Sequence, residues 1–166
     1  MILIEPTIQT RFGRALRRRA LAAFLQQASA AARLEGEVAV LLTTDAHLRR
    51  LNREFRRKDR PTDVLSFPAP EPVDGHRSIA GDLAVSVDTA ARQAEELAHP
   101  LATELQILVL HGLLHLAGYD HETDRGRMAR KESALRRHFG LAEGLIERSR
   151  KASKAVPATP RRSRKP

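Results

Sequence analysis

The spacing of hydrophobic and polar residues predicts a chain in which helices alternate with short buried strands. Between residues 11 and 34, apolar residues recur every three or four positions, which predicts one long helix that stops at Gly36. The residues expected on its buried face are Phe12, Leu16, Ala20, Ala23, Phe24 and Ala31.

Four short apolar segments are predicted strands. Residues 2–4 open the sheet, while residues 38–42 and 64–67 are continuous apolar runs bounded by turn residues, as in buried strands. Residues 81–87 alternate apolar and polar positions and form the fourth strand. Strand–helix–strand units predict parallel neighbours, whereas the short connection at 69–80 predicts an antiparallel return.

Four further helices complete the pattern. One is capped by Thr44 or Asp45 and has Leu48, Leu51 and Phe55 on one face. The others are expected at residues 88–98, 101–117 and 123–139, with Met128, Leu135 and Phe139 inward in the last. The helix at 101–117 is apolar nearly all round from Ile107 onward, which is typical of a buried central helix. We therefore expect an α+β fold, a small mixed, mainly parallel four-stranded sheet surrounded by helices.

Length and charge divide the chain into two parts. Its 166 residues predict one domain, assigned to residues 1–147, and the net charge of +9 lies almost wholly outside it. Residues 148–166 contain eight basic and no acidic residues, whereas residues 1–147 contain 21 basic against 20 acidic. We expect the C-terminal segment to be a disordered basic tail that contacts a polyanion.

The remaining composition excludes several classes of protein. The chain has no cysteine, so it has neither a disulfide framework nor a thiolate ligand. It begins with no basic segment typical of a signal peptide, and no apolar run reaches the ~18 residues that span a bilayer. These features predict a cytoplasmic protein without a membrane partner, and they give no oligomeric state.

The segment HGLLHLAGYDH, residues 111–121, carries the candidate chemistry. His111 and His115 are four residues apart on the predicted helix, so their imidazoles lie on the same face. Gly118 can end the helix in a left-handed conformation and bring His121 back toward the pair. Three imidazoles around Zn²⁺ leave a fourth position open, which is the arrangement of a catalytic zinc site.

A packing role for these histidines is the main alternative. Three of them beside the most apolar helix would each need polar partners in a dry environment, so we favour metal binding. The spacing also equals the zinc segment of metzincin peptidases, HExxHxxGxxH, but Gly112 occupies the position of the catalytic glutamate. A glycine cannot act as general base, which disfavours a peptidase.

Three segments together resemble the YbeY family of bacterial endoribonucleases. They are residues 51–68 (LNREFRRKDRPTDVLSFP), residues 81–86 (GDLAVS) and the histidine segment, and the resemblance covers residues 36–140. It implies a zinc-dependent endoribonuclease acting on single-stranded RNA in ribosomal RNA maturation, notably at the small-subunit 3′ end, and in ribosome quality control. It also implies one zinc ion per chain, held by the three histidines, with ribosomal RNA and ribosomal subunits as partners.

The resemblance further assigns a functional arginine to Arg56. A guanidinium can clamp two phosphoryl oxygens and offset the negative charge that develops during phosphodiester cleavage. We take Arg56 and His111 as catalytic residues, and Arg53, Arg57 and Lys58 as candidate RNA contacts. A solvated helix face is the alternative for these basic residues.

Some other residues have one expected structural role, and others have two alternative roles. Asp63 either caps the following strand or orients a ligand imidazole, and Asp120 either shapes a turn or orients a ligand or the nucleophile. Met128 is expected in the core. The histidines expected not to bind metal are His47, His76, His99 and His138. A ribosome-associated protein with a structural zinc remains the alternative to an enzyme.

Overall fold

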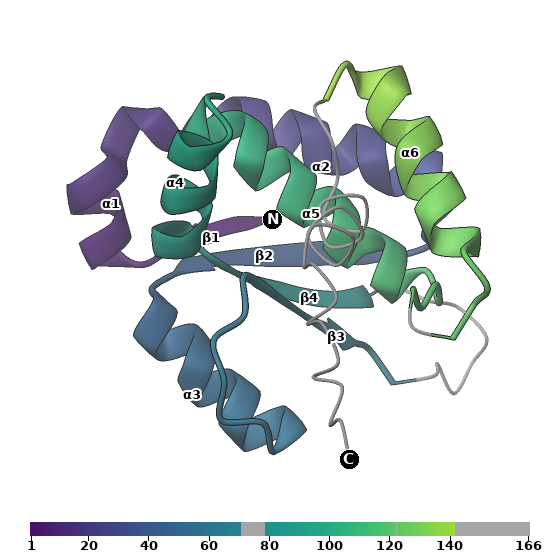
Figure 1. Cartoon of the computed structure of the whole chain (residues 1–166), viewed down its shortest axis with the longest axis horizontal. Coiled ribbons are helices and arrows are strands. Elements are labelled where there is room, and N and C mark those ends of the chain that lie inside the picture. The colour runs from purple at the N-terminus through teal and green to yellow at the C-terminus, as the bar shows by residue number, and fades with distance from the viewer. Residues whose placement is uncertain (71–78, 122, 142–166) are drawn as a thin grey trace, which may run out of the picture.

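A computed structural model describes residues 1–70, 79–121 and 123–141 of the chain (Figure 1). The predicted tail and His76 lie outside the described residues, as does most of the predicted loop at 69–78. The strands are β1 (Ile2–Ile4), β2 (Glu37–Thr43), β3 (Val64–Pro68) and β4 (Ile79–Ser86). The helices are α1 (Pro6–Phe12), the short 3₁₀ helix η1 (Gly13–Leu16), α2 (Arg18–Ala32), α3 (Asp45–Arg56), α4 (Val87–Glu96), α5 (Leu101–Leu116) and α6 (Arg127–Phe139).

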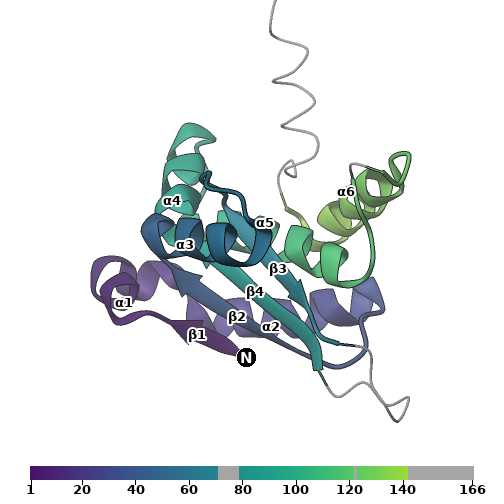
Figure 2. The same cartoon turned by 90° about the horizontal axis from the view of Figure 1, so that it is seen from below.

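The four strands form one sheet in the order β1-β2-β4-β3. β1, β2 and β4 are parallel, and β3 pairs with β4 antiparallel, which confirms the predicted mixed, mainly parallel sheet. The expectation that β2 and β3 are parallel neighbours was wrong, because β4 lies between them and β3 runs in the opposite direction. Helices α2, α4 and α5 cover one face of the sheet and α3 covers the other (Figures 1 and 2). The fold is therefore α+β, with α5 at its centre.

Helix α5 is buried along most of its length, as its continuous apolar pattern predicts. Leu105, Leu108, Leu113 and Leu114 are fully inaccessible and belong to the main core, which the sheet and α2 complete. A smaller core on the opposite face centres on Leu48 beneath α3. Burying so many large aliphatic side chains, each worth about 2 kcal/mol, fixes the position of α5 and of every residue it carries.

The long helix predicted over residues 11–34 was wrong, because the chain breaks it twice. Gly13 has a φ of +41° and Arg17 a φ of +46°, and both conformations interrupt an α-helix. The buried face of α2 is consequently shifted: Ala20 and Ala23, expected inside, are exposed. The buried residues of α2 are Leu21, Phe24, Leu25, Ala28 and Ala32.

Two other predictions need correction. Helix α6 begins at Arg127 rather than at residue 123, after an N-cap residue, Gly126, in a left-handed conformation; the Asp124 carboxylate accepts hydrogen bonds from the backbone N–H groups of Gly126 and Met128. Phe55 was expected on the same helix face as Leu48, which is buried, but its side chain is 62% exposed. The Phe55 ring packs edge-to-face against Phe67, with 5.3 Å between the ring centroids.

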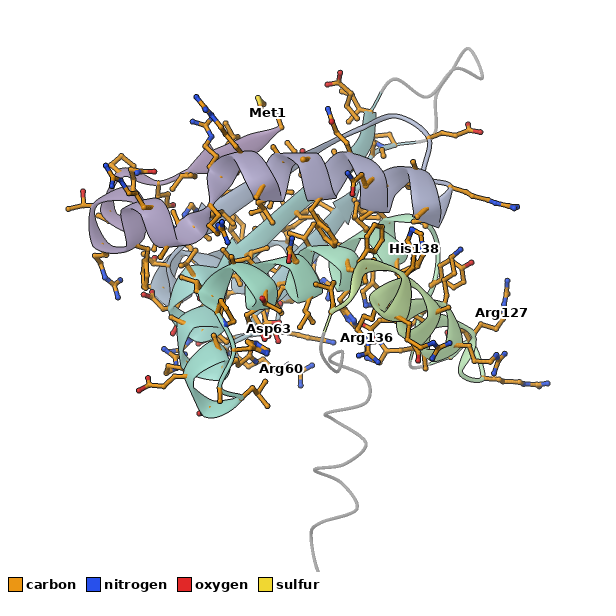
Figure 3. All side chains as sticks on the ribbon, turned by 90° about the horizontal axis from the view of Figure 1, so that it is seen from above. Met1, Arg60, Asp63, Arg127, Arg136 and His138 are labelled. Carbon is orange, nitrogen blue, oxygen red and sulfur yellow. The ribbon has the colours of Figure 1, made fainter. Side chains whose placement is uncertain are left out.

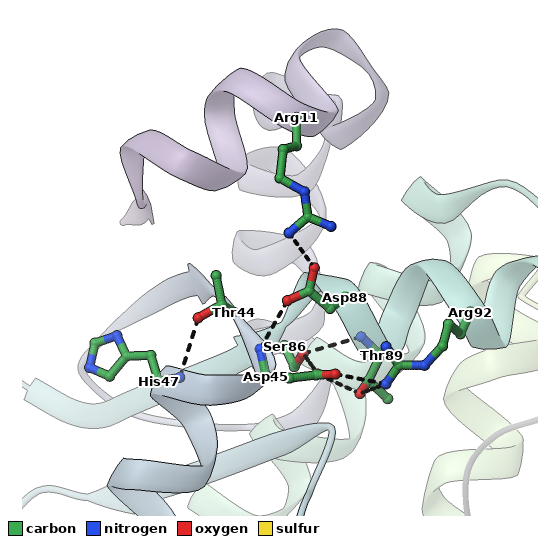
Figure 4. Close-up of polar contacts among 8 residues, drawn as sticks. All are labelled: Arg11, Thr44, Asp45, His47, Ser86, Asp88, Thr89 and Arg92. Atoms are coloured by element: carbon green, nitrogen blue, oxygen red, sulfur yellow. Dashed lines mark hydrogen bonds and ion pairs between the residues drawn. The ribbon is translucent and has the colours of Figure 1, made fainter.

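Polar groups join the beginnings of α3 and α4 at the carboxyl ends of β2 and β4 (Figure 4). Asp45 accepts hydrogen bonds from the hydroxyls of Ser86 and Thr89, and from Arg92 at 2.8 Å. Burial alone would raise the pKa of Asp45, but these hydrogen bonds outweigh it and hold that pKa below its usual value. This end of the sheet is therefore occupied by internal ion pairs and hydrogen bonds.

Among the described residues, no single helix is long and apolar enough to cross a membrane. α4 and α5 pass that test only when taken together, and they are bent by 117° at their junction.

Candidate active site

Helix α5 and the turn after it bring three histidines together. His111 and His115 are one turn apart on α5, and the chain reverses at Gly118, which has a φ of +82°, so that His121 returns to the pair. The Nε2 atoms of His111 and His115 are 3.1 Å apart, and the candidate ligand atoms of all three histidines lie within 4.8 Å of one another. The predicted grouping is confirmed.

This donor set fits zinc. With Zn–N distances of about 2.0–2.1 Å, two ligands of a tetrahedral zinc lie about 3.3 Å apart, close to the separation of His111 and His115. His111 is buried, His115 is half-buried and His121 is exposed, so the cluster opens toward solvent on one side. An open side is typical of catalytic zinc sites rather than of closed structural ones.

A buried carboxylate fixes the orientation of His111. Glu132 of α6 is only 1% exposed, and the Nδ1–H of His111 donates to it at 3.0 Å. A proton held on Nδ1 leaves the lone pair on Nε2, the atom that faces His115. Glu132 therefore selects the tautomer that binds a metal.

His115 is kept neutral by its surroundings. Burial lowers the pKa of His115 to about 4, with further lowering from His111, His121 and the positive charge of Arg56. Metal binding requires a neutral imidazole, so His115 does not have to lose a proton to act as a ligand near neutral pH.

Gly112 faces the sheet and not the three histidines. A Cβ at this position would lie 2.8 Å from Cδ2 of Leu83, and the Ser66 hydroxyl donates to the Gly112 carbonyl at 3.2 Å. The glycine thus allows α5 to pack closely on β3 and β4. A glutamate, as in metzincins, would collide with the sheet, which accounts for the departure from that motif.

The histidines open into a pocket of about 460 Å³. One wall is formed by His115, His121 and the turn between them, and the other by α3 and the loop that follows it. Arg56 lies on this second wall, opposite the histidines, and its charge acts on His115. The pocket therefore brings a guanidinium and two of the candidate metal ligands to one cavity.

The other basic residues of this region divide between the pocket and the outer surface. Lys58 and Arg60 line the pocket, whereas Arg53 and Arg57 are exposed and do not line it. Asn52 holds the loop in place, because its side-chain amide donates to the Arg60 carbonyl at 2.9 Å while the residue itself is buried. The sequence named Lys58 as a candidate RNA contact, which stays a prediction, and assigned Arg60 no specific role.

The structure also gives the contacts of the other residues that the sequence analysis singled out. Asp63 accepts a hydrogen bond from the Val64 backbone N–H at 2.9 Å and shapes the start of β3. Asp120 lines the pocket, and its carboxylate also accepts from the Thr123 hydroxyl at 2.8 Å. Met128 is fully buried in the core.

The other described histidines do not join the cluster. His47 contacts Thr43 and Glu5, and His99 contacts Glu104 at 2.6 Å. His138 lies with its ring edge-to-face against Phe139.

Glu132 is the functional residue that sequence reasoning missed. It lies four residues after Met128 and three before Leu135, on the inward face of α6. A carboxylate on a predicted buried face needs a polar partner, and this was the available signal.

An open cluster of three imidazoles, one of them oriented by a buried glutamate, beside a polar pocket that an arginine also lines, defines a metal-dependent hydrolase that acts on an anionic substrate. The model of the family described as endoribonuclease YbeY matches residues 5–140. The chain belongs to this family and is accordingly an endoribonuclease, a hydrolase that cleaves RNA.

Individual relatives agree with this assignment. The endoribonuclease YbeY of Koribacter versatilis is 54% identical over 134 residues, which cover 81% of this chain and 85% of the relative. That of Anaeromyxobacter dehalogenans is 45% identical over 158 residues, covering 94% and 79%. The solution structure of TM1509 from Thermotoga maritima is similar with a TM-score of 0.53 and 30% identity, covering 96% of this chain and all of that one.

Proposed function

We propose that this chain is a zinc-dependent endoribonuclease specific for single-stranded RNA, acting in ribosomal RNA processing and ribosome quality control. Its expected site of action is the 3′ end of the small-subunit RNA, with ribosomal subunits as partners. The observation that carries the proposal is that Arg56 lines one open pocket together with His115 and His121, two members of the three-histidine cluster.

The residues of the pocket have separate tasks. When bound, zinc supplies a Lewis acid that polarises a phosphoryl oxygen and makes water a stronger nucleophile near neutral pH. Arg56 offers its planar guanidinium to two oxygens of the scissile phosphate, where negative charge develops during cleavage. Lys58 and Arg60 line the same pocket and bind the neighbouring backbone phosphates.

Two features of the pocket favour a single strand. It is a confined cavity of about 460 Å³ between α5 and the loop after α3, and its lining includes three basic residues, Arg56, Lys58 and Arg60. A duplex presents each phosphate on a wide rigid cylinder, whereas a flexible single strand can bring one phosphate into a recess.

The basic residues outside the pocket extend this contact. Arg53 and Arg57 are exposed beside Arg56, where they would bind RNA that leaves the pocket. Residues 148–166, with eight basic and no acidic residues, would add a tether that is sensitive to salt and blind to sequence. Because ribosomal RNA matures in the cytoplasm of bacteria, we place the activity there.

Single-turnover cleavage of a single-stranded RNA and of the same sequence in a duplex tests the proposal. We expect cleavage of the single strand only, and a loss of about 10²–10³-fold in rate for Arg56→Ala, the effect of removing one donor that stabilises developing charge. Arg50→Ala is the matched control, because Arg50 is exposed on the same helix and does not line the pocket. Equal rates for the two variants would contradict the role of Arg56.

A further inference from the structure

A second groove lies at the β1 edge of the sheet, away from the histidines. Its volume is about 930 Å³, and Leu3 and Ile4 of β1 contribute apolar surface to it. All the charged residues that line it are arginines. They are Arg14, Arg17, Arg18 and Arg19, and we refer to this feature as the arginine groove.

The break between α1 and α2 creates the arginine groove. The left-handed conformation of Arg17 ends η1 and starts α2 in a new direction, so Arg14 comes to line the same surface as Arg18 and Arg19. In the single straight helix that the sequence predicted, Arg14, Arg17 and Arg18 would share one face and Arg19 would lie off it, whereas in the fold all four line the same surface. The groove is therefore a product of the tertiary fold.

Most of the positive charge in the arginine groove has no internal partner. Arg18 donates to the Ile2 carbonyl at 3.1 Å and so has a structural contact with β1. In the part of the chain that the structure describes, no carboxylate pairs with Arg14, Arg17 or Arg19, and all three are exposed. Nearby Arg11, by contrast, pairs with Asp88 at 2.6 Å.

A ligand for three adjacent guanidinium groups must carry closely spaced negative charges. The chain's own residues 148–166 do not qualify, because they carry eight basic and no acidic residues. RNA does qualify, since its phosphates follow one another along a chain and each accepts a forked pair of hydrogen bonds from arginine.

We propose that the arginine groove is a second RNA-binding site, which holds the phosphate backbone of a substrate at a distance from the cleavage site. This rests on the proposed function only in taking RNA as the substrate. β1 and β3 are the two edges of the sheet, three strand spacings or about 14 Å apart, and the metal pocket lies on the β3 side. Figure 3 shows Met1, which precedes β1, and Arg60 of the pocket on opposite sides of the molecule.

The consequence is a dependence on substrate length. A short oligonucleotide can fill the metal pocket without reaching the arginine groove, whereas a long ribosomal RNA fragment contacts both. The groove should thus raise affinity for long RNA and leave the cleavage of short RNA unchanged.

The test is the triple variant Arg14→Gln, Arg17→Gln, Arg19→Gln, which leaves the Arg18 contact intact. Its matched control is Arg33→Gln, Arg130→Gln, Arg137→Gln, which also removes three exposed arginines, one of them at a left-handed position like Arg17. The dissociation constant of a long ribosomal RNA fragment is measured for both over a series of salt concentrations, together with cleavage of a short single strand.

For the groove variant we expect weaker binding of long RNA and a salt dependence that is shallower by about 2 in log–log slope, from about 0.7 per phosphate contact. Cleavage of the short strand should not change. Binding to anionic lipid vesicles is measured alongside RNA binding. The proposal would be overturned by an equal loss of RNA affinity in the control, by unchanged RNA affinity in the groove variant, or by a loss of affinity seen only with the vesicles.

Two single variants guard against misfolding of the triple variant. Arg14→Gln and Arg19→Gln leave the left-handed residue 17 untouched, and each should reduce the slope by about 0.7. The dissociation constant for long RNA is a separate measurement from RNA cleavage. A protein without nuclease activity would therefore contradict the proposed function, while the comparison of dissociation constants would still test the arginine groove.

Discussion

Replacing Glu132 by Gln removes a buried negative charge beside His111 with almost no change in volume. In the wild type, the carboxylate can only accept a hydrogen bond, so it holds the proton on Nδ1 of His111 and leaves Nε2 free. A glutamine amide can also turn and donate to Nδ1, which favours the tautomer whose Nε2 carries the proton. Zinc must then compete with that proton.

The structure sets the size of the effect. The hydrogen bond measures 3.0 Å, and both groups are shielded from water, with Glu132 1% and His111 7% exposed. Loss of such a partner of a ligand histidine typically weakens metal binding about 10- to 100-fold, or about 1.4 to 2.7 kcal/mol. Stability of the metal-free protein should change little or increase, because burying a carboxylate is itself unfavourable.

The assay is competition for zinc with a chromophoric chelator, with thermal melting of the metal-free protein alongside. Glu104→Gln is the matched control. Glu104 is also a buried carboxylate that contacts a histidine, with 2.6 Å between its Oε2 and Nε2 of His99, but it lies at the other end of α5. Only Glu132→Gln should lose zinc affinity. Wild-type affinity in Glu132→Gln, or the same loss in Glu104→Gln, would refute the argument that Glu132 orients a ligand.

Three further predictions concern packing, pH and charge. Gly81→Ala should lower the free energy of unfolding in urea by about 2–4 kcal/mol, because its Cβ would lie 2.4 Å from the Phe67 carbonyl oxygen at a φ of +147°; an unchanged midpoint would contradict this. With chelator present, the melting temperature should fall as pH drops from 6.5 toward 4. In this window the unfolded chain protonates His115 while the folded chain, with its pKa of about 4, does not, and His115→Gln should flatten the trend. Arg56→Lys should retain more RNA cleavage activity than Arg56→Ala but less than wild type, since lysine keeps the charge and loses the two-pronged contact; wild-type activity would refute the need for a guanidinium.

Local patterns were enough to predict α5, the strands and the histidine cluster. The apolar run that includes Leu105 and Leu114 fixes a buried helix whatever surrounds it, and His111 and His115 share a face of any helix. The parallel pairing of β1 with β2 followed from a connection long enough to hold a helix, whereas the same rule failed for β2 and β3, which β4 separates. These features depend on residues close together in sequence.

What the sequence did not predict depends on contacts between distant segments. The pairing of Glu132 with His111 joins α6 to α5 across 21 residues, and no spacing rule specifies it. The helix break at Gly13 and Arg17 was hidden because apolar residues on both sides keep a helical period through the break. The arginines of residues 14–19 are a visible cluster in the sequence, but the groove that they line with β1 depends on the tertiary fold.

Cleavage of a single-stranded ribosomal RNA fragment by the purified protein, with chelator and after zinc is restored, tests the central claim most directly. A His121→Ala protein prepared in parallel controls for contaminating nucleases, because His121 is exposed and its loss leaves the core intact. We expect that chelation abolishes cleavage, that zinc restores it, and that the variant is inactive throughout. Cleavage that persists in chelator, or in the His121→Ala protein, would contradict a zinc-dependent active site at these three histidines.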